Sequence, residues 1–313
     1  MSDPKVSVII PNYNHARYLR QRIETVLSQT YRNFEVIILD DCSTDSSREI
    51  IESYRGHSMV TKIIYNENNS GSPFRQWRKG LQVATGQWIW IAESDDYADE
   101  KFLATMLFGL HDCANVGLIY CDSFVVRDET VLPETFAPLK NRQIGTSRWS
   151  ESHCAPGIEE IANYVLRFGT INNTSAVLFR RDLLVETDPF DIDLKYIGDK
   201  YAFIKVLSKS NAAYINAPLN YYRNPFNSKH SDKLLGYFFE QFLIFNWVDR
   251  HVNIPGEKFN AAFYEQTQFS FLRHWRSLHL YVRLFRINGS LVIRNIFFNL
   301  IRPFRPRSKQ AGR

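Results

Sequence analysis

Residues 86–96 read GQWIWIAESDD, an apolar run that ends in acidic residues. The five residues WIWIA predict a strand buried on both faces, and Gly86 before them predicts the end of a helix. Three carboxylates follow within four residues, Glu93, Asp95 and Asp96. Crowded carboxylates repel one another, and a divalent cation would relieve that repulsion because hard cations take oxygen ligands. The alternative interpretation of the same residues is a solvated acidic turn.

The chain on either side of this stretch alternates between strand-like and helix-like segments. Short apolar runs at residues 5–10, 35–39 and 62–65 predict buried strands, with amphipathic helices between them. This alternation is typical of an α/β protein with a doubly wound, mostly parallel, Rossmann-like sheet. The run at 35–39 also ends in an acidic pair, Asp40 and Asp41. Ligands bind at the carboxyl ends of such strands, so both acidic segments are expected at one edge of the sheet.

Composition and cysteine spacing argue against a membrane-spanning protein, a secreted protein and a cysteine-based metal site. A hydrophobic content of 44% in 313 residues is enough for a sizeable core. We see no apolar run near the ~18 residues that a membrane span needs, and no signal peptide at the N-terminus. The four cysteines, Cys42, Cys113, Cys121 and Cys154, have no metal-site spacing. They are expected to be reduced thiols of a cytoplasmic protein.

The charge is concentrated at the C-terminal end. No Asp or Glu follows Glu265, whereas ten Lys or Arg residues do, and subtracting them from the net charge of +5 leaves −5 for residues 1–265. We therefore expect a main domain over residues 1–225 and a helical, basic extension over residues 226–313. Basic tails bind anionic surfaces, so peripheral contact with a membrane is one interpretation and nucleic-acid binding is another.

A helical apolar stripe runs through the extension and predicts packing against the domain instead. Its members are Phe271, Trp275, Leu278, Val282 and Phe285. The later segment GSLVIRNIFFNLIRPFRPRSK is better explained as an interfacial segment against anionic lipid.

Five ordered blocks of the sequence resemble the family 2 inverting glycosyltransferases, which have the GT-A nucleotide-diphospho-sugar transferase fold. The resemblance covers roughly residues 5–225. Its blocks are VSVIIPNYN, FEVIILDDCSTDSS, NSGSPFRQWRKGLQVATGQWIWIAESDD, IGDKYAFIKVL and PLNYYR. One block alone is weak, but five in the right order are specific.

The resemblance implies a nucleotide pocket around Asp41. By analogy, Asp41 accepts a hydrogen bond from the uracil imide, Tyr13 stacks on the base and Pro11 lines the pocket. A carboxylate suits the imide N–H and an aromatic face suits the base. Thymine carries the same imide, so both UDP- and dTDP-sugars fit. For Asp41 alone, a helix N-cap is the alternative.

The resemblance also implies a metal site. Asp95 matches the last carboxylate of the family's DxD motif, which holds Mn²⁺ or Mg²⁺ against the donor diphosphate. Glu93 stands at the first position, where Asp is common, and is expected near the ribose or a water ligand. Arg75 resembles a position that contacts the donor, with a solvated arginine as the alternative.

Asp199 is the predicted catalytic base. In the family, this residue begins a helix after an irregular loop and removes the proton of the acceptor hydroxyl. Family members often carry Glu-Asp at this point, whereas Gly198 precedes Asp199 here. A plain helix cap is the alternative for Asp199, and Asp191 and Asp193 are the next candidates for the base.

The resemblance therefore implies a metal-dependent inverting glycosyltransferase that moves a sugar from UDP or dTDP to a hydroxyl group. We expect a saccharide acceptor, lipid-linked at the cytoplasmic face of the inner membrane, in polysaccharide synthesis. We expect no nucleic-acid partner. A sugar-nucleotide nucleotidyltransferase is one alternative, although PNYNHARYL lacks its glycine- and arginine-rich loop. A non-catalytic nucleotide-sugar-binding protein is the other.

Overall fold

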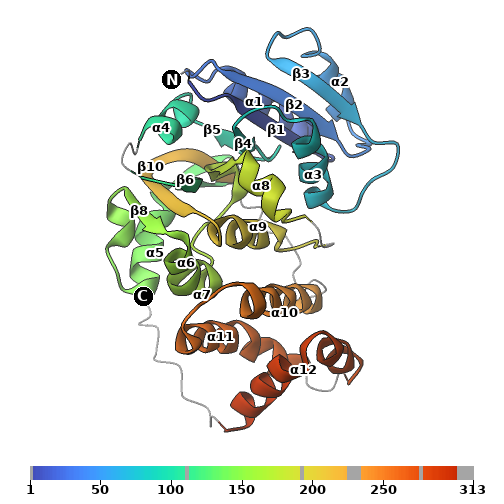
Figure 1. Ribbon diagram of the computed structural model, residues 1–313. Coiled ribbons are helices and arrows are strands. Elements are labelled where there is room, and N and C mark those ends of the chain that lie inside the picture. Colours follow the sequence, from blue (N-terminus) through green and yellow to red (C-terminus); the bar gives the residue numbers. More distant parts are fainter. Residues whose placement is uncertain (1–2, 110–112, 191–193, 224–233, 275–277, 302–313) are drawn as a thin grey trace. The chain divides into compact units, whose positions relative to one another are not determined.

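The computed structural model describes residues 3–109, 113–190, 194–223, 234–274 and 278–301. The chain divides into two compact units (Figure 1). The first comprises Met1–Val165 and Gly169–Ser228, and the second Leu166–Phe168 and Lys229–Arg313. The first is an α/β unit and the second is helical.

The described strands all belong to the first unit. They are β1 (Val6–Asn12), β2 (Phe34–Asp40), β3 (Val60–Tyr65), β4 (Trp88–Ile91), β5 (Tyr97–Ala98), β6 (Val116–Arg127), β7 (Thr130–Thr135), β8 (His153–Pro156), β9 (Val177–Arg180) and β10 (Asn211–Arg223). Its helical segments are α1 (Ala16–Leu27), α2 (Ser47–Glu52), α3 (Pro73–Val83), α4 (Phe102–Phe108), α5 (Phe136–Ile144), η1 (Arg148–Ser150), α6 (Gly157–Glu160), η2 (Ile161–Val165), η3 (Thr174–Ala176), α8 (Arg181–Thr187) and α9 (Gly198–Leu207).

One sheet runs through the first unit in the order β3-β2-β1-β4-β9-β6-β10-β5. The strands β1 to β4 pair in parallel, as do β6 and β10, whereas β9 and β5 run antiparallel to their neighbours. The predicted mostly parallel sheet is therefore confirmed. Because β1 lies between β2 and β4, the acidic segments that follow those two strands meet at the same edge of the sheet (Figure 1).

The central strands form where the sequence is continuously apolar. Every residue of β1 and β2 is buried, as expected for parallel strands covered by helices on both faces. The edge strand β3 is only partly buried. Trp90 of β4 stacks on Phe102 of α4, with ring centroids 4.3 Å apart. This core holds the strand ends, and with them the site, in fixed positions.

Gly86 serves a purpose that differs from the prediction. Helix α3 ends at Val83 and its C-cap is Ala84, in extended conformation, so Gly86 does not terminate the helix. A Cβ atom on Gly86 would lie 2.5 Å from the backbone nitrogen of Ser7. Glycine is required here because the chain passes against the backbone of β1 before it enters β4.

The segment 127–157 contains β7, α5, η1 and β8. Strand β7 returns along β6 through a turn at Asp128 and Glu129, which have φ angles of 47° and 62°. Helix α5 ends at Gly145 in the left-handed conformation, φ 76°. Non-glycine residues rarely adopt positive φ, so no clear sequence signal marks this hairpin.

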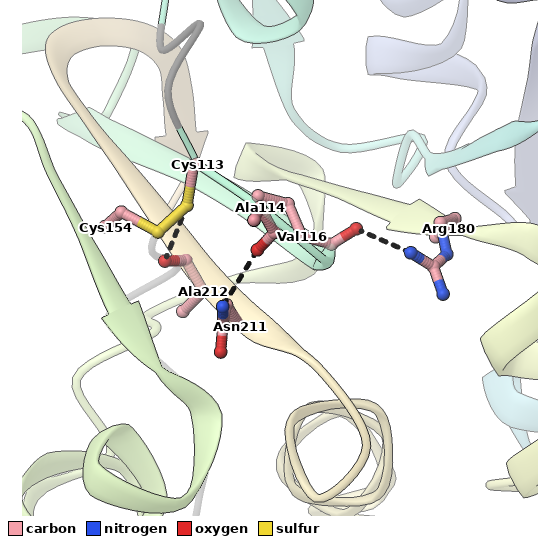
Figure 2. Close-up of a disulfide and its surroundings, with 7 residues drawn as sticks. All are labelled: Cys113, Ala114, Val116, Cys154, Arg180, Asn211 and Ala212. Atoms are coloured by element: carbon pink, nitrogen blue, oxygen red, sulfur yellow. Dashed lines mark hydrogen bonds between the residues drawn. A yellow bond between two sulfur atoms is a disulfide. The ribbon is translucent and has the colours of Figure 1, made fainter.

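Two of the four cysteines are paired, so the prediction that all four are reduced is wrong. Cys113 and Cys154 form a disulfide with Cα atoms 5.8 Å apart, while Cys42 and Cys121 are free. Figure 2 shows the bond beside the Ala212 carbonyl of β10. Strand β8 pairs with β10 and brings Cys154 opposite the segment before β6. The two cysteines are 41 positions apart in the sequence, and this separation hides their proximity from any spacing rule.

The second unit contains α7 (Leu166–Phe168), α10 (Leu234–His251), α11 (Gly256–His274) and α12 (Leu278–Ile301). Its core includes Phe245, Phe263 and Leu291. No described helix combines the length and the apolar character that crossing a bilayer requires. Of the predicted stripe, Val282 and Phe285 are 45% and 54% exposed. Packing of the stripe against the first unit stays a prediction. The other three side chains of the stripe lie outside the described ones.

Candidate active site

A cavity of about 330 Å³ opens at the carboxyl edge of β1 and β2. Four of the predicted site residues line it together, namely Pro11, Tyr13, Asp41 and Glu93. Tyr13 follows the end of β1 and is 44% exposed, so an aromatic surface is available beside the cavity. An exposed aromatic ring next to a buried carboxylate suits a planar heterocycle with an N–H group.

Asp41 is buried and anchors the loop that leads to α3. Its carboxylate accepts hydrogen bonds from the backbone N–H of Ser70 at 2.9 Å, from the Ser70 hydroxyl at 2.8 Å and from the Gln76 amide at 2.8 Å. The N-cap of the following helix α2 is Ser46, so Asp41 does not cap that helix. The carboxylate thus shapes the cavity wall that it shares with Tyr13.

A second cavity of about 400 Å³ adjoins the first, because Glu93 and Pro73 line both. Asp95 and Asp199 line the second cavity, together with Tyr222 at the end of β10. The structure therefore brings the predicted metal ligand and the predicted base to one cavity, next to the one that holds Tyr13 and Asp41. The two cavities together suit an elongated ligand with a base at one end.

Burial and crowding dominate the electrostatics of the acidic turn. Burial, reinforced by the charge of Asp95, raises the pKa of Glu93 to about 8 and that of Asp96 to about 7. The Trp77 indole N–H donates to Glu93 Oε1 at 2.8 Å and opposes that rise. Trp77 is 3% exposed and also lines the second cavity. A cation beside these carboxylates would favour their charged forms.

The donor set fits a divalent cation that takes most of its ligands from substrate. Within the described residues, no three His, Cys, Asp or Glu side chains converge into a complete metal site. Mg²⁺ and similar ions are commonly held by one or two carboxylates plus substrate phosphates. Asp95 faces the cavity, whereas the Asp96 carboxylate accepts the backbone N–H of Arg223 at 2.9 Å. Asp95 would therefore be the protein ligand.

Asp199 stands in the first turn of α9, two residues after the N-cap Ile197. Its Oδ1 accepts the backbone N–H of Lys200 at 2.7 Å. The preceding Gly198 lies so close to Phe74 of α3 that a Cβ would be 2.7 Å from the ring. This contact seats the start of α9 against the helix that carries Trp77. Of the alternative bases, Asp191 and Asp193 lie outside the described residues.

Arg75 differs from the other predicted residues. Its side chain is exposed and donates to the Ser70 carbonyl at 2.8 Å, and it is not among the residues that line the two cavities. Conversely, His15 and Gln76 line the first cavity although sequence reasoning did not single them out. His15 Nδ1 lies 2.8 Å from the hydroxyl of Ser94 in the acidic turn. Its position directly after PNYN was the available signal.

Comparisons with known proteins find similar chains among the glycosyltransferases. Residues 7–158 match the model of glycosyl transferase family 2. The chain is 37% identical over 101 residues to glycosyltransferase GlyG of Streptococcus pneumoniae, which covers 32% of this chain and 33% of GlyG. It is 36% identical over 101 residues to the poly(ribitol-phosphate) beta-N-acetylglucosaminyltransferase TarS of Staphylococcus aureus, covering 32% of this chain and 18% of TarS. The chain thus aligns with a third or less of the length of these relatives.

Two solved structures share the fold. The structure of S. aureus TarS 1–349 in complex with UDP-GlcNAc has a TM-score of 0.64 at 20% identity and covers 85% of this chain and 73% of that one. The Pyrobaculum calidifontis mannosyltransferase PcManGT, in complex with GDP-Man and Mn²⁺, has a TM-score of 0.57 at 17% identity. It covers 96% of this chain and 88% of that one. The predicted GT-A fold is confirmed by these likenesses.

Proposed function

The chain belongs to glycosyltransferase family 2 through residues 7–158, and on this premise we propose that it is an inverting glycosyltransferase. It moves a sugar from a UDP- or dTDP-linked donor to a hydroxyl group of a saccharide acceptor. The observation that carries this proposal is the pair of adjoining cavities, one with Tyr13 and Asp41 and the other with Asp95 and Asp199.

Different residues act on different parts of the donor and the acceptor. Tyr13 and Asp41 bind the base, and Glu93 lies where the nucleotide side meets the sugar side. Asp95 would hold a divalent cation, Mn²⁺ or Mg²⁺, which supplies positive charge against the leaving diphosphate. Asp199 accepts the proton of the acceptor hydroxyl while the new bond to the anomeric carbon forms and the bond to the diphosphate breaks. A displacement in one step inverts the configuration at that carbon.

The acceptor belongs to a cell-surface polymer in this proposal. The name of TarS, a poly(ribitol-phosphate) beta-N-acetylglucosaminyltransferase, supports that class of acceptor. We place the reaction in the cytoplasm, with the second unit on the cytoplasmic membrane face. Two observations support contact with an anionic membrane. Helix α12 exposes the apolar side chains of Val282, Phe285 and Ile293, and no acidic residue follows Glu265 in the sequence.

The test is a paired substitution of Asp199. Asp199→Asn keeps the size of the side chain and removes proton acceptance, so transfer should fall by about 10²–10⁴-fold while the melting temperature changes little. Asp199→Ala should lose transfer equally. The assay follows nucleoside diphosphate release from a panel of UDP- and dTDP-sugars with Mn²⁺ and a saccharide acceptor.

Asp182→Asn is the matched control, because Asp182 is also a first-turn aspartate but on α8, exposed and paired with Arg180. It should leave transfer unchanged. Near wild-type transfer by Asp199→Asn would remove Asp199 as the base. A wild-type protein that binds nucleotide sugars without any turnover would favour a non-catalytic binding protein.

A further inference from the structure

Arg223 lies behind the acidic turn that carries Asp95. It is the last residue of β10, and its side chain is only 8% exposed. Its Nη1 donates to the backbone carbonyl of Asp95 at 2.8 Å, and its backbone N–H donates to the Asp96 carboxylate at 2.9 Å. Arg223 is not among the residues that line the two cavities. Its contacts with the turn therefore lie outside these two cavities.

Several elements hold the guanidinium group of Arg223 in place. Its Nη2 donates to Glu129, on the turn between β6 and β7, at 3.0 Å, and also to Gln21 of α1. The rings of Tyr18 and Tyr97 lie 4.6 and 4.8 Å from its central carbon. Only a planar, multiply donating group makes all of these contacts at once, and the single ammonium of lysine would not.

Arg22 holds the other end of the same turn. Its Nε donates to the Glu93 carbonyl at 2.8 Å, and the side chain is fully buried. The central carbon of its guanidinium group lies 5.6 Å from the centre of the Trp90 ring. Two backbone carbonyls, two residues apart, are thus each fixed by an arginine. Two buried positive charges also offset the three carboxylates of the turn. With its peptide held in this way, the Asp95 side chain is left facing the second cavity.

We propose that Arg223 is a positioning residue that fixes the Asp95 peptide, so that the Asp95 carboxylate is oriented toward a divalent cation on the donor diphosphate. The inference rests on the proposed function and adds a role for the end of β10. It also assigns Asp96 to the support of the turn, because its carboxylate is bound by the Arg223 backbone. Residues that hold a metal ligand in place without touching the metal commonly lower metal affinity by about 10–100-fold when they are replaced.

The experiment compares Arg223→Lys and Arg223→Gln with Arg17→Gln. Arg17 pairs with the same Glu129 at 3.5 Å and is 70% exposed, so its replacement removes a nearby charge without touching the acidic turn. Three quantities are measured for each protein: the Mn²⁺ concentration that half-saturates UDP binding in calorimetry, UDP affinity in EDTA, and hydrogen exchange across residues 91–98.

Both Arg223 variants should raise the half-saturating Mn²⁺ concentration at least about tenfold and speed exchange in residues 91–98. UDP affinity in EDTA should stay at the wild-type value, and Arg17→Gln should behave as wild type throughout. If an Arg223 variant does not fold, Glu129→Gln can be used instead, because it removes the ion pair between Glu129 and the Arg223 guanidinium group. It should shift the Mn²⁺ dependence in the same direction by a smaller factor.

Three results would overturn the proposal. The first is wild-type Mn²⁺ dependence in Arg223→Lys, and the second is a lower melting temperature without any change in Mn²⁺ dependence. The third is a loss of UDP affinity in EDTA, which would mean that Arg223 contacts the nucleotide directly. A wild-type protein that binds neither UDP nor dTDP, with or without Mn²⁺, would instead reject the proposed function, and this inference with it.

Discussion

The contact between Gly198 and Phe74 predicts how one methyl group should affect both stability and catalysis. In Gly198→Ala, the new Cβ would lie 2.7 Å from Phe74 ring atoms, whereas carbon atoms pack best at about 3.5–4.0 Å. The ring cannot move away freely, because it packs edge-on against Trp77 with centroids 4.9 Å apart. Helix α9 must therefore shift by about 1 Å, and Asp199 with it.

Two free-energy effects of this substitution oppose each other. Overpacking costs about 1–3 kcal/mol, while Ala in place of Gly in a helix gains about 0.4–1 kcal/mol by restricting the unfolded chain. We expect a net loss of about 1–2 kcal/mol, which lowers the melting temperature by about 3–6 °C in a domain of this size. Displacement of a catalytic group by about 1 Å should lower the transfer rate by about 10²-fold.

Thermal unfolding and the rate of nucleoside diphosphate release test this prediction. Gly56→Ala is the control, since a Cβ there meets nothing within 4 Å. Adding Phe74→Leu to Gly198→Ala should recover part of both losses, because residues in contact couple energetically. If Gly198→Ala matches the Gly56 control in melting temperature and in transfer rate, the contact with Phe74 does not position Asp199.

Three further predictions concern other parts of the chain. Asp95→Ala should abolish the Mn²⁺-dependent part of UDP binding, and Asp41→Ala should weaken UDP binding while keeping its Mn²⁺ dependence; unchanged calorimetric affinity in both would reject the site. Burial acts to raise the pKa of Glu35, but hydrogen-bond donors around it outweigh burial and lower the pKa from 4.5 to about 2. Glu35→Gln should therefore cost about 1–2 kcal/mol at pH 7, after allowing for solvent screening. The difference should disappear as the pH falls from 4.5 toward 2, and urea unfolding at pH 7 and pH 3 measures it. In the second unit, Phe285→Asp should reduce sedimentation with anionic vesicles at low salt; wild-type protein that does not sediment with them would reject the membrane contact.

The local features of this protein follow from its amino-acid sequence alone. Apolar runs such as VSVII and FEVIIL specify strands because their side chains have no favourable place outside a core. Their regular alternation with amphipathic helices determined the mostly parallel sheet, and polar residues after the strands marked its ligand-binding edge. The order of the blocks around Asp41, Asp95 and Asp199 then pointed to the family.

Contacts between distant segments were decided only by the tertiary structure. The antiparallel strand β9 enters the sheet between β4 and β6, and β8 brings Cys154 to Cys113. The support of Asp95 by Arg223 joins residues 128 positions apart, and the fit of Gly198 against Phe74 joins α9 to α3. Propensity and periodicity describe interactions within a few residues along the chain. Such pairs form only when the whole sheet brings the ends of its strands together, so no local pattern could identify them.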